Sequence, residues 1–247
     1  MIKNKIKNLY GVILFLMFWY LGSFIIGEKM IPTPHSTIVK LIQLMKRDFL
    51  FDILYSTYRI FASIFISIII GVPLGILIGV NKLCDRILSP LIYLLYPIPK
   101  IAFLPIFMVM FGLGNLSKIL LMVTIIIFQI LIVTRDGVKS IDKDLLIAAK
   151  VMKFSKKDRI LKLILPSIAP NIFSALRVSI GIAISALFFS ENYATKYGIG
   201  YFIMNSWSMV DYKGMFAGVL ALSIVALIIF KLIDIIENKV CRWNNIN

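Results

Sequence analysis

Six long apolar runs are the feature that most constrains how this chain can fold. A helix needs roughly 20 apolar residues to cross a bilayer core of about 30 Å. With 60% hydrophobic and only 16% charged residues, the chain is too apolar for a soluble domain of 247 residues. We therefore expect an all-α integral membrane protein, with spans near residues 9–26, 57–80, 87–111, 119–134, 171–190 and 215–236.

The distribution of Lys and Arg predicts the orientation of these spans. The first run follows Lys3, Lys5 and Lys7, which is also typical of a signal peptide, but no small-x-small cleavage site follows, so we expect a retained anchor. Basic residues are about twice as frequent on the side that holds both termini, which predicts that both termini face the cytoplasm. The net charge of +15 is thereby explained by topology, without a nucleic-acid partner.

Two parts of the chain differ in character. Residues 1–56 are expected to hold the anchor helix and an external interfacial segment, because Pro32 and Pro34 precede a short periodic run. Residues 57–247 are expected to form the transmembrane domain, with a long loop at 135–169. In this loop Lys and Arg alternate with apolar residues at helical spacing, which predicts an amphipathic element on the cytoplasmic face where a soluble partner can act.

Three glycines in the second apolar run are spaced by four residues. Gly71, Gly75 and Gly79 would share one helix face and allow a neighbouring helix to approach closely. We interpret this pattern as helix packing rather than chemistry.

The third run contains a lysine between prolines. Lys100 follows Pro97 and Pro99, and Pro105 lies further along the same run. A charged lysine inside a membrane costs roughly 3 kcal/mol on insertion scales, so it should face a cavity, a partner or the interface. Two interpretations stay open: Lys100 belongs to a pathway or subunit contact, or the prolines end the helix early and Lys100 sits at a wet end.

Two charged residues mark the fifth run. Arg177 and Glu191 are fourteen residues apart, which is roughly 21 Å along a straight helix at about 1.5 Å per residue, too far for a direct pair. Both are pathway candidates, and Glu191 near the outer end is a candidate gate, because acids in membrane segments are rare. The alternative for Glu191 is simple solvation at the interface.

The sequence offers no catalytic or metal-binding constellation. His35 is the single histidine and lies between Pro34 and Ser36 without a nearby Cys or carboxylate cluster. No Gly directly precedes a Lys, so a phosphate loop is absent. Cys84 and Cys241 are too far apart in the chain to suggest a metal cluster or a disulfide framework. We expect no catalytic residue, no metal and no cofactor on this chain, and any ATP on another chain.

Several segments together resemble a known family. The segment Leu146 to Ser155, reading LIAAKVMKFS, is followed by Pro166 in IleLeuPro and resembles the EAA motif of ABC importer permeases. The stretch PIPKIAFLPIFMVMFGLGNLSK at 97–118, SerGluAsn at 190–192, GlyIleGly at 198–200 and Asp234 before a basic tail are similar to the nitrate, sulfonate and taurine permease subfamily. The resemblance extends from Ile31 to Trp243.

The resemblance implies a fold and a set of partners. The fold would be MetI-like, with six transmembrane helices and a cytoplasmic coupling-helix loop, in the cytoplasmic (inner) membrane of a bacterium. The chain would form a permease homodimer, work with ABC ATPase subunits that bind ATP and Mg, and receive a sulfonate, nitrate, taurine or vitamin-precursor solute from an external binding protein. Loop lysines would contact the ATPase or membrane lipid. The residues that the resemblance and the amphipathic pattern assign to ATPase coupling are Ala148, Ala149, Val151, Met152, Lys153, Phe154, Ile160, Leu161, Leu165 and Pro166.

Two positions depart from the motif. Ile147 stands in the place of its glutamate and Lys153 in the place of its glycine. A left-handed backbone at Lys153 would cost about 1 kcal/mol relative to glycine.

Two other classes of protein are alternatives to a permease. An ATP-independent carrier would use the basic loop as a lipid anchor, but no convincing internal repeat supports it. An integral-membrane enzyme would need clustered intramembrane His, Asp or Ser residues, which are nearly absent.

Overall fold

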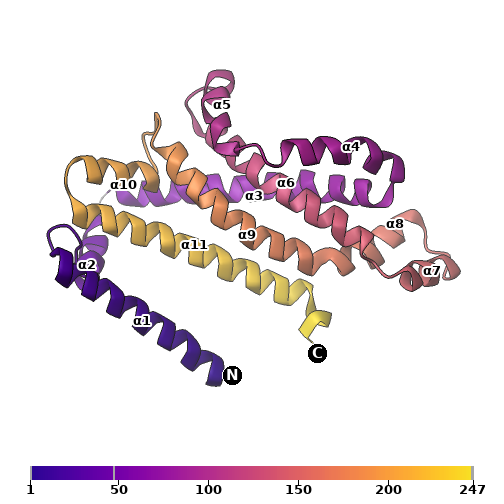
Figure 1. Ribbon diagram of the computed structural model, residues 1–247, viewed down its shortest axis with the longest axis horizontal. Helices are drawn as coiled ribbons and strands as arrows, with labels where there is room; N and C mark the ends of the chain where they lie inside the picture. Colours follow the sequence, from indigo (N-terminus) through magenta and orange to yellow (C-terminus); the bar gives the residue numbers. More distant parts are fainter. Residues whose placement is uncertain (1, 47, 246–247) are drawn as a thin grey trace. The chain divides into compact units, whose positions relative to one another are not determined.

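The computed structural model describes residues 2–46 and 48–245, and all regular structure within them is helical. Figure 1 shows the individual helices. The α-helices are α1 (Ile2–Ile26), α2 (Pro34–Leu44), α3 (Phe49–Val80), α4 (Lys82–Leu95), α5 (Leu104–Phe111), α6 (Asn115–Lys139), α7 (Lys143–Val151), α8 (Lys156–Asp158), α9 (Leu165–Glu191), α10 (Ile199–Ser208) and α11 (Tyr212–Val240). Short 3-10 turns cover Lys100–Phe103 and Arg242–Asn245, and a π-helical turn covers Arg159–Ile164.

Within the described residues, four helical stretches are long and apolar enough to cross a membrane. They are Phe49–Val80, Asn115–Lys139, Lys156–Glu191 and Tyr212–Val240. A fifth span is present if Lys82–Leu95 and Lys100–Phe111 count as one, although the two helices meet at 88°. The apolar helix Tyr10–Ile26 is shorter than these. A multi-pass membrane protein follows, with α1 and the bent pair as the elements that decide the number of spans.

The chain divides into two compact units. One unit comprises Met1–Ser56 and Glu191–Val225, and the other comprises Thr57–Ser190 and Ala226–Asn247. In the first unit, Trp19 Nε1 donates to the Pro32 carbonyl at 2.9 Å. Thr33 then caps α2 by accepting a hydrogen bond from the Ser36 N–H, with Pro34 at the first helical position.

In the second unit, the three spaced glycines lie against α6. A Cβ at Gly75 would lie 2.6 Å from Thr134 Cβ, one at Gly79 would lie 2.6 Å from Val138 Cβ, and one at Gly71 would lie 3.1 Å from an Ile130 methyl. Any larger residue at Gly75 or Gly79 would force α3 away from α6, since these contacts are closer than real Cβ atoms adopt. Small residues let membrane helices approach in this way.

Candidate functional site

The loop that the sequence predicts to be cytoplasmic contains α7, which ends in a tight turn. The Asp142 side chain accepts from the Asp144 N–H at 2.9 Å and caps the helix. At its other end the Phe154 N–H donates to the Ala149 carbonyl at 3.0 Å, and the Lys153 N–H donates to the Lys150 carbonyl at 3.0 Å. This is a Schellman motif, which places its C′ residue in left-handed backbone. Lys153 has φ 55°, so the conformation expected for the glycine position is adopted by a lysine.

The second limb of the loop begins at Ser155. Its hydroxyl accepts from the Asp158 N–H at 3.1 Å and donates to the Asp158 carboxylate at 2.6 Å, which caps α8. Lys162 forms an ion pair with Asp158 at 2.7 Å. The chain then passes through the π turn Arg159–Ile164 into α9, and π turns within helices are frequent at functional sites. Figure 1 shows α7 and α8 together beyond the ends of α6 and α9.

The loop presents several large apolar side chains at its surface. Val151 is 77% exposed and Met152 is 68% exposed. We define the apolar loop surface as the exposed residues Leu145, Ile147, Val151, Met152 and Leu161. The other residues assigned to coupling from sequence are distributed around it: Ala148 and Lys153 are exposed, Phe154, Ile160, Leu165 and Pro166 are half-buried, and Ala149 is buried. Ala149 therefore supports the turn from inside.

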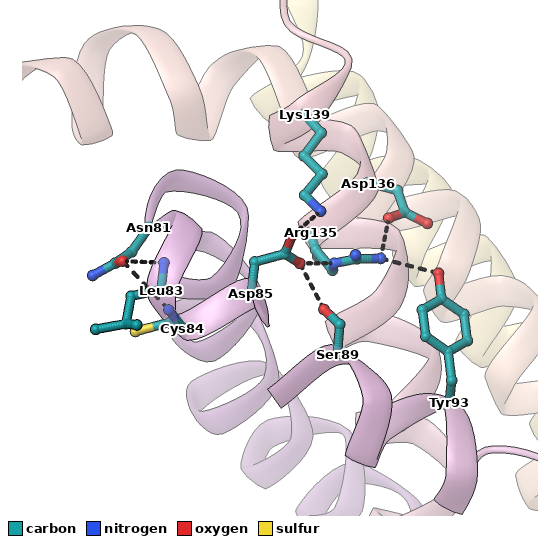
Figure 2. A network of polar contacts seen from close by, with 9 residues as sticks. All are labelled: Asn81, Leu83, Cys84, Asp85, Ser89, Tyr93, Arg135, Asp136 and Lys139. Atoms are coloured by element: carbon teal, nitrogen blue, oxygen red, sulfur yellow. Dashed lines mark hydrogen bonds and ion pairs between the residues drawn. The ribbon is translucent and has the colours of Figure 1, made fainter. Parts of the chain in front are cut away.

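A polar network ties the start of this loop to α4 (Figure 2). The Asp85 carboxylate accepts from Arg135 Nε at 2.7 Å, from Ser89 Oγ at 2.6 Å and from Lys139 Nζ at 2.6 Å. Arg135 also donates to the Tyr93 hydroxyl at 3.0 Å. Because Arg135 and Lys139 occupy the last turns of α6, the end of α6 that leads into α7 is held to α4. From the sequence both residues are expected only as charges of the loop at 135–169, because no local pattern connects them with Asp85.

Arg177 belongs to an ion cluster between α9 and α11. Its guanidinium donates to Asp234 at 2.8 Å and to Glu237 at 2.5 Å. The nearby thiol of Cys241 is buried, and this burial together with the Glu237 carboxylate raises the pKa of Cys241 above its usual value. The structure thus pairs Arg177 with acids far along the chain. These acids fix the relation of α9 to α11 within this unit.

Glu191 is fully buried in the other unit. Its carboxylate accepts from Ser56 Oγ at 2.7 Å and from the Gly200 N–H at 2.7 Å. The Ile199 N–H donates to Ser56 Oγ at 2.9 Å. These N–H groups form the first turn of α10, where the helix dipole favours a negative charge. Burial removes the alternative of a carboxylate solvated at the interface.

Asp52 completes this cap. Its carboxylate accepts from the Gly198 N–H at 2.8 Å, so α3 supplies two of the side chains that satisfy the start of α10. The motifs SerGluAsn and GlyIleGly are separate segments of the sequence, and the structure brings them together.

Lys100 lies at the break between α4 and α5. Its ammonium donates to the carbonyls of Leu95, Tyr96 and Ile98 and lies 4.7 Å from the centre of the Phe128 ring. α4 ends at Leu95, directly before the segment that contains Pro97 and Pro99. Lys100 caps the interrupted end.

Over residues 2–46 and 48–245, no group of three or more His, Cys, Asp and Glu side chains is placed to hold an ion.

Comparison with known proteins decides the class. Residues 71–242 match the family described as the binding-protein-dependent transport system inner membrane component. The chain belongs to this family. It is 29% identical to the putative aliphatic sulfonates transport permease of Bacillus subtilis, over 91% of this chain and 82% of the relative. It is 29% identical to the nitrate import permease of Synechococcus elongatus, over 79% and 74% respectively, and 26% identical to the taurine transport permease of Escherichia coli, over 94% and 87%.

Membership of this family settles the main functional question. The chain is a multi-pass membrane permease subunit of an ATP-driven importer, and not an enzyme. ATP hydrolysis takes place on a separate chain, and the family works with ATPase and solute-binding partners. The carrier alternative is not favoured.

Proposed function

We propose that the apolar loop surface is where this permease docks its ATPase. Apolar side chains exposed to water gain roughly 25 cal/mol for each Å² that a partner buries, and Val151 and Met152 are the most exposed of the large apolar side chains in the loop. The exposed lysines around them, Lys150, Lys153, Lys156 and Lys157, suit a partner groove with acidic rims. The observation that carries the proposal is this combination of exposed apolar residues and a rigid, capped turn.

The proposal includes a route by which movement of the ATPase reaches the membrane helices. ATP-driven movement of the docked partner would shift α7, and α7 is joined to the end of α6 that Asp85 holds to α4. Differential contacts of this kind are what allow a ligand to shift a membrane subunit between two states. We propose that the Asp85 network passes the movement of the loop to the helices of its own unit.

The proposal extends to topology and assembly. Six spans would be formed by α1, α3, the bent pair α4–α5, α6, α9 and α11, with both termini in the cytoplasm and two copies of the chain lining the pathway. Residues 1–56 would provide the anchor and an external segment, and residues 57–247 the transport domain. Nucleotide and Mg would be bound only by the ATPase, while loop lysines without a protein partner would meet anionic lipid.

The proposed solute is small and is delivered by an external binding protein. The similar proteins are named for aliphatic sulfonates, nitrate and taurine, and each of these solutes carries an oxyanion group. A pyrimidine vitamin precursor is a second candidate. Glu191 is proposed as a charge-dependent gate in the solute's passage; unchanged uptake by Glu191→Gln across a range of pH would exclude that role.

Co-purification tests the docking proposal. Met152→Asp places a charge in the centre of the apolar loop surface, so the solubilised permease should lose its ATPase subunit and ATP-dependent uptake should cease. Met209→Asp is the matched control, because Met209 is 71% exposed and lies between α10 and α11. If Met152→Asp retains the ATPase and uptake as fully as Met209→Asp does, the docking assignment is wrong.

A further inference from the structure

Lys100 differs from three other cations of its unit, which pair with carboxylates. Arg135 meets the Asp85 carboxylate, Arg177 meets Asp234 and Glu237, and Lys162 meets Asp158. Lys100 is held only by three backbone carbonyls and an aromatic ring, and none of the carboxylates in the described part of the chain pairs with it. An ionisable side chain within a membrane segment is expensive and points to a functional site.

The lysine lines a cavity beside the helix break. The cavity has a volume of about 240 Å³, which suits a solute of a few heavy atoms. Its lining consists of Tyr96, Pro99, Lys100, Ile101, Ile125, Phe128, Gln129, Ser179 and Ile182. Non-helical backbone at membrane depth is tolerated where it lines a cavity or is buried in protein, and the interrupted backbone at Tyr96 and Pro99 does line this one.

The local charge in the cavity is positive. Two of the carbonyls that hold Lys100, those of Leu95 and Tyr96, lie at the end of α4. The C-terminal end of a helix carries about half a negative charge, against the full positive charge of the ammonium. The Tyr96 hydroxyl donates to Gln129 Oε1 at 2.9 Å. With its oxygen engaged, Gln129 has its amide N–H groups left to offer, and these are donors. A cation and an amide donor in a mostly apolar cavity suit a small anion.

We propose that this cavity is a binding subsite for a small oxyanion, of the sulfonate, nitrate or carboxylate kind, within the permease. The ammonium of Lys100 would supply the attracting charge and Gln129 a directed hydrogen bond, while Phe128 and Ile182 form the apolar walls. The proposal rests on the proposed import of a small anionic solute and adds where the permease holds it. A lipid phosphate offers the same chemistry, so the test separates the two sources.

Calorimetric titration of the solubilised permease–ATPase complex, without the external binding protein, tests the subsite. The probes are ethanesulfonate and nitrate, and ethyl methyl sulfone is a neutral analogue of the sulfonate. Saturable binding of both anions and about tenfold weaker binding of the sulfone are expected, because the sulfone lacks the charge that Lys100 attracts. Lys100→Met should abolish anion binding.

A second variant keeps the test independent of the cap on α4. Gln129→Leu leaves Lys100 and its carbonyl partners intact and should weaken anion binding about tenfold. Gln43→Leu, an exposed glutamine on α2, is the matched control and should bind as the natural sequence does. Retention of the ATPase by each variant shows that it is folded. If the natural permease purifies without its ATPase, the proposed docking is contradicted. Titration of the permease alone would then still decide the subsite.

Three results would overturn the subsite: no saturable anion binding by the natural sequence, equal binding by Gln129→Leu and Gln43→Leu, or equal affinity for the sulfone and the sulfonate. Displacement of ethanesulfonate by short-chain phosphatidylglycerol would assign the cavity to lipid and would also overturn it.

Discussion

Gly198 lies directly against the carboxylate of Glu191, so closely that a Cβ at residue 198 would stand 2.6 Å from Glu191 Cδ. The same carboxylate accepts from the Gly200 N–H two residues later. Glycine at 198 is therefore what allows the acid to reach the first turn of α10. The two motifs SerGluAsn and GlyIleGly are parts of one cap.

Gly198→Ala should disrupt this cap. The added methyl group cannot be accommodated without displacing the Glu191 carboxylate, so we expect a loss of about 1–3 kcal/mol in stability. Gly181→Ala in α9 is the control, because a Cβ there meets no atom within 4 Å and helix propensity should favour it by up to about 1 kcal/mol. Thermal unfolding of the detergent-solubilised chains should therefore shift in opposite directions; a shift of the same sign would contradict the packing argument.

Lys153→Gly should stabilise the turn that follows α7. Lys153 has φ 55°, which costs about 1 kcal/mol more for a residue with a Cβ than for glycine. The gain should appear as a higher unfolding temperature of the permease–ATPase complex. Lys150→Gly removes the same charge from the last turn of α7, where the backbone is still helical, and should destabilise by up to about 1 kcal/mol. If both variants lose stability, the turn does not carry the strain that its dihedral indicates.

The local features of this fold could be predicted from the sequence, because they depend on near neighbours. The apolar runs, the break at Pro97 and Pro99, and the glycine position now held by Lys153 are of this kind. The site contacts could not be predicted, because they join distant residues: Glu191 meets Ser56 across 135 positions and Arg177 meets Asp234 across 57. Periodicity shows which face a side chain occupies. It does not show which helix that face meets.

Asp85→Asn should loosen the connection between α4 and the end of α6. The amide cannot pair electrostatically with both Arg135 and Lys139, and the partly exposed site limits the expected loss to about 1–2 kcal/mol. Transport should suffer more than stability if the network passes on the loop's movement. We expect reconstituted vesicles to hydrolyse ATP while taking up several-fold less solute.

Asp136→Asn is the matched control for Asp85→Asn. Asp136 also pairs with Arg135, at 3.0 Å, but its side chain is 54% exposed, so its loss should cost less than about 1 kcal/mol. Uptake per ATP hydrolysed should remain close to that of the natural sequence. Equal uptake ratios for the two variants would show that the Asp85 network does not transmit the movement.

Asp211, just before α11, should make the stability of the protein depend on pH in the acid range. Burial acts to raise the pKa of Asp211, but the Gly214 N–H at 2.9 Å and the Lys40 ammonium at 3.0 Å favour the charged form and hold that pKa below its usual value. Because the folded-state pKa is the lower one, the stabilisation is present above the unfolded pKa of about 3.9 and is lost as pH falls through the folded value.

Asp211→Asn keeps an acceptor for the Gly214 N–H but cannot titrate, so its unfolding temperature should depend less on pH below about pH 4. Asp211→Ala also loses the helix cap, worth about 1 kcal/mol at neutral pH. Identical acid profiles for Asp211→Asn and the natural sequence would show that this carboxylate does not contribute to acid sensitivity.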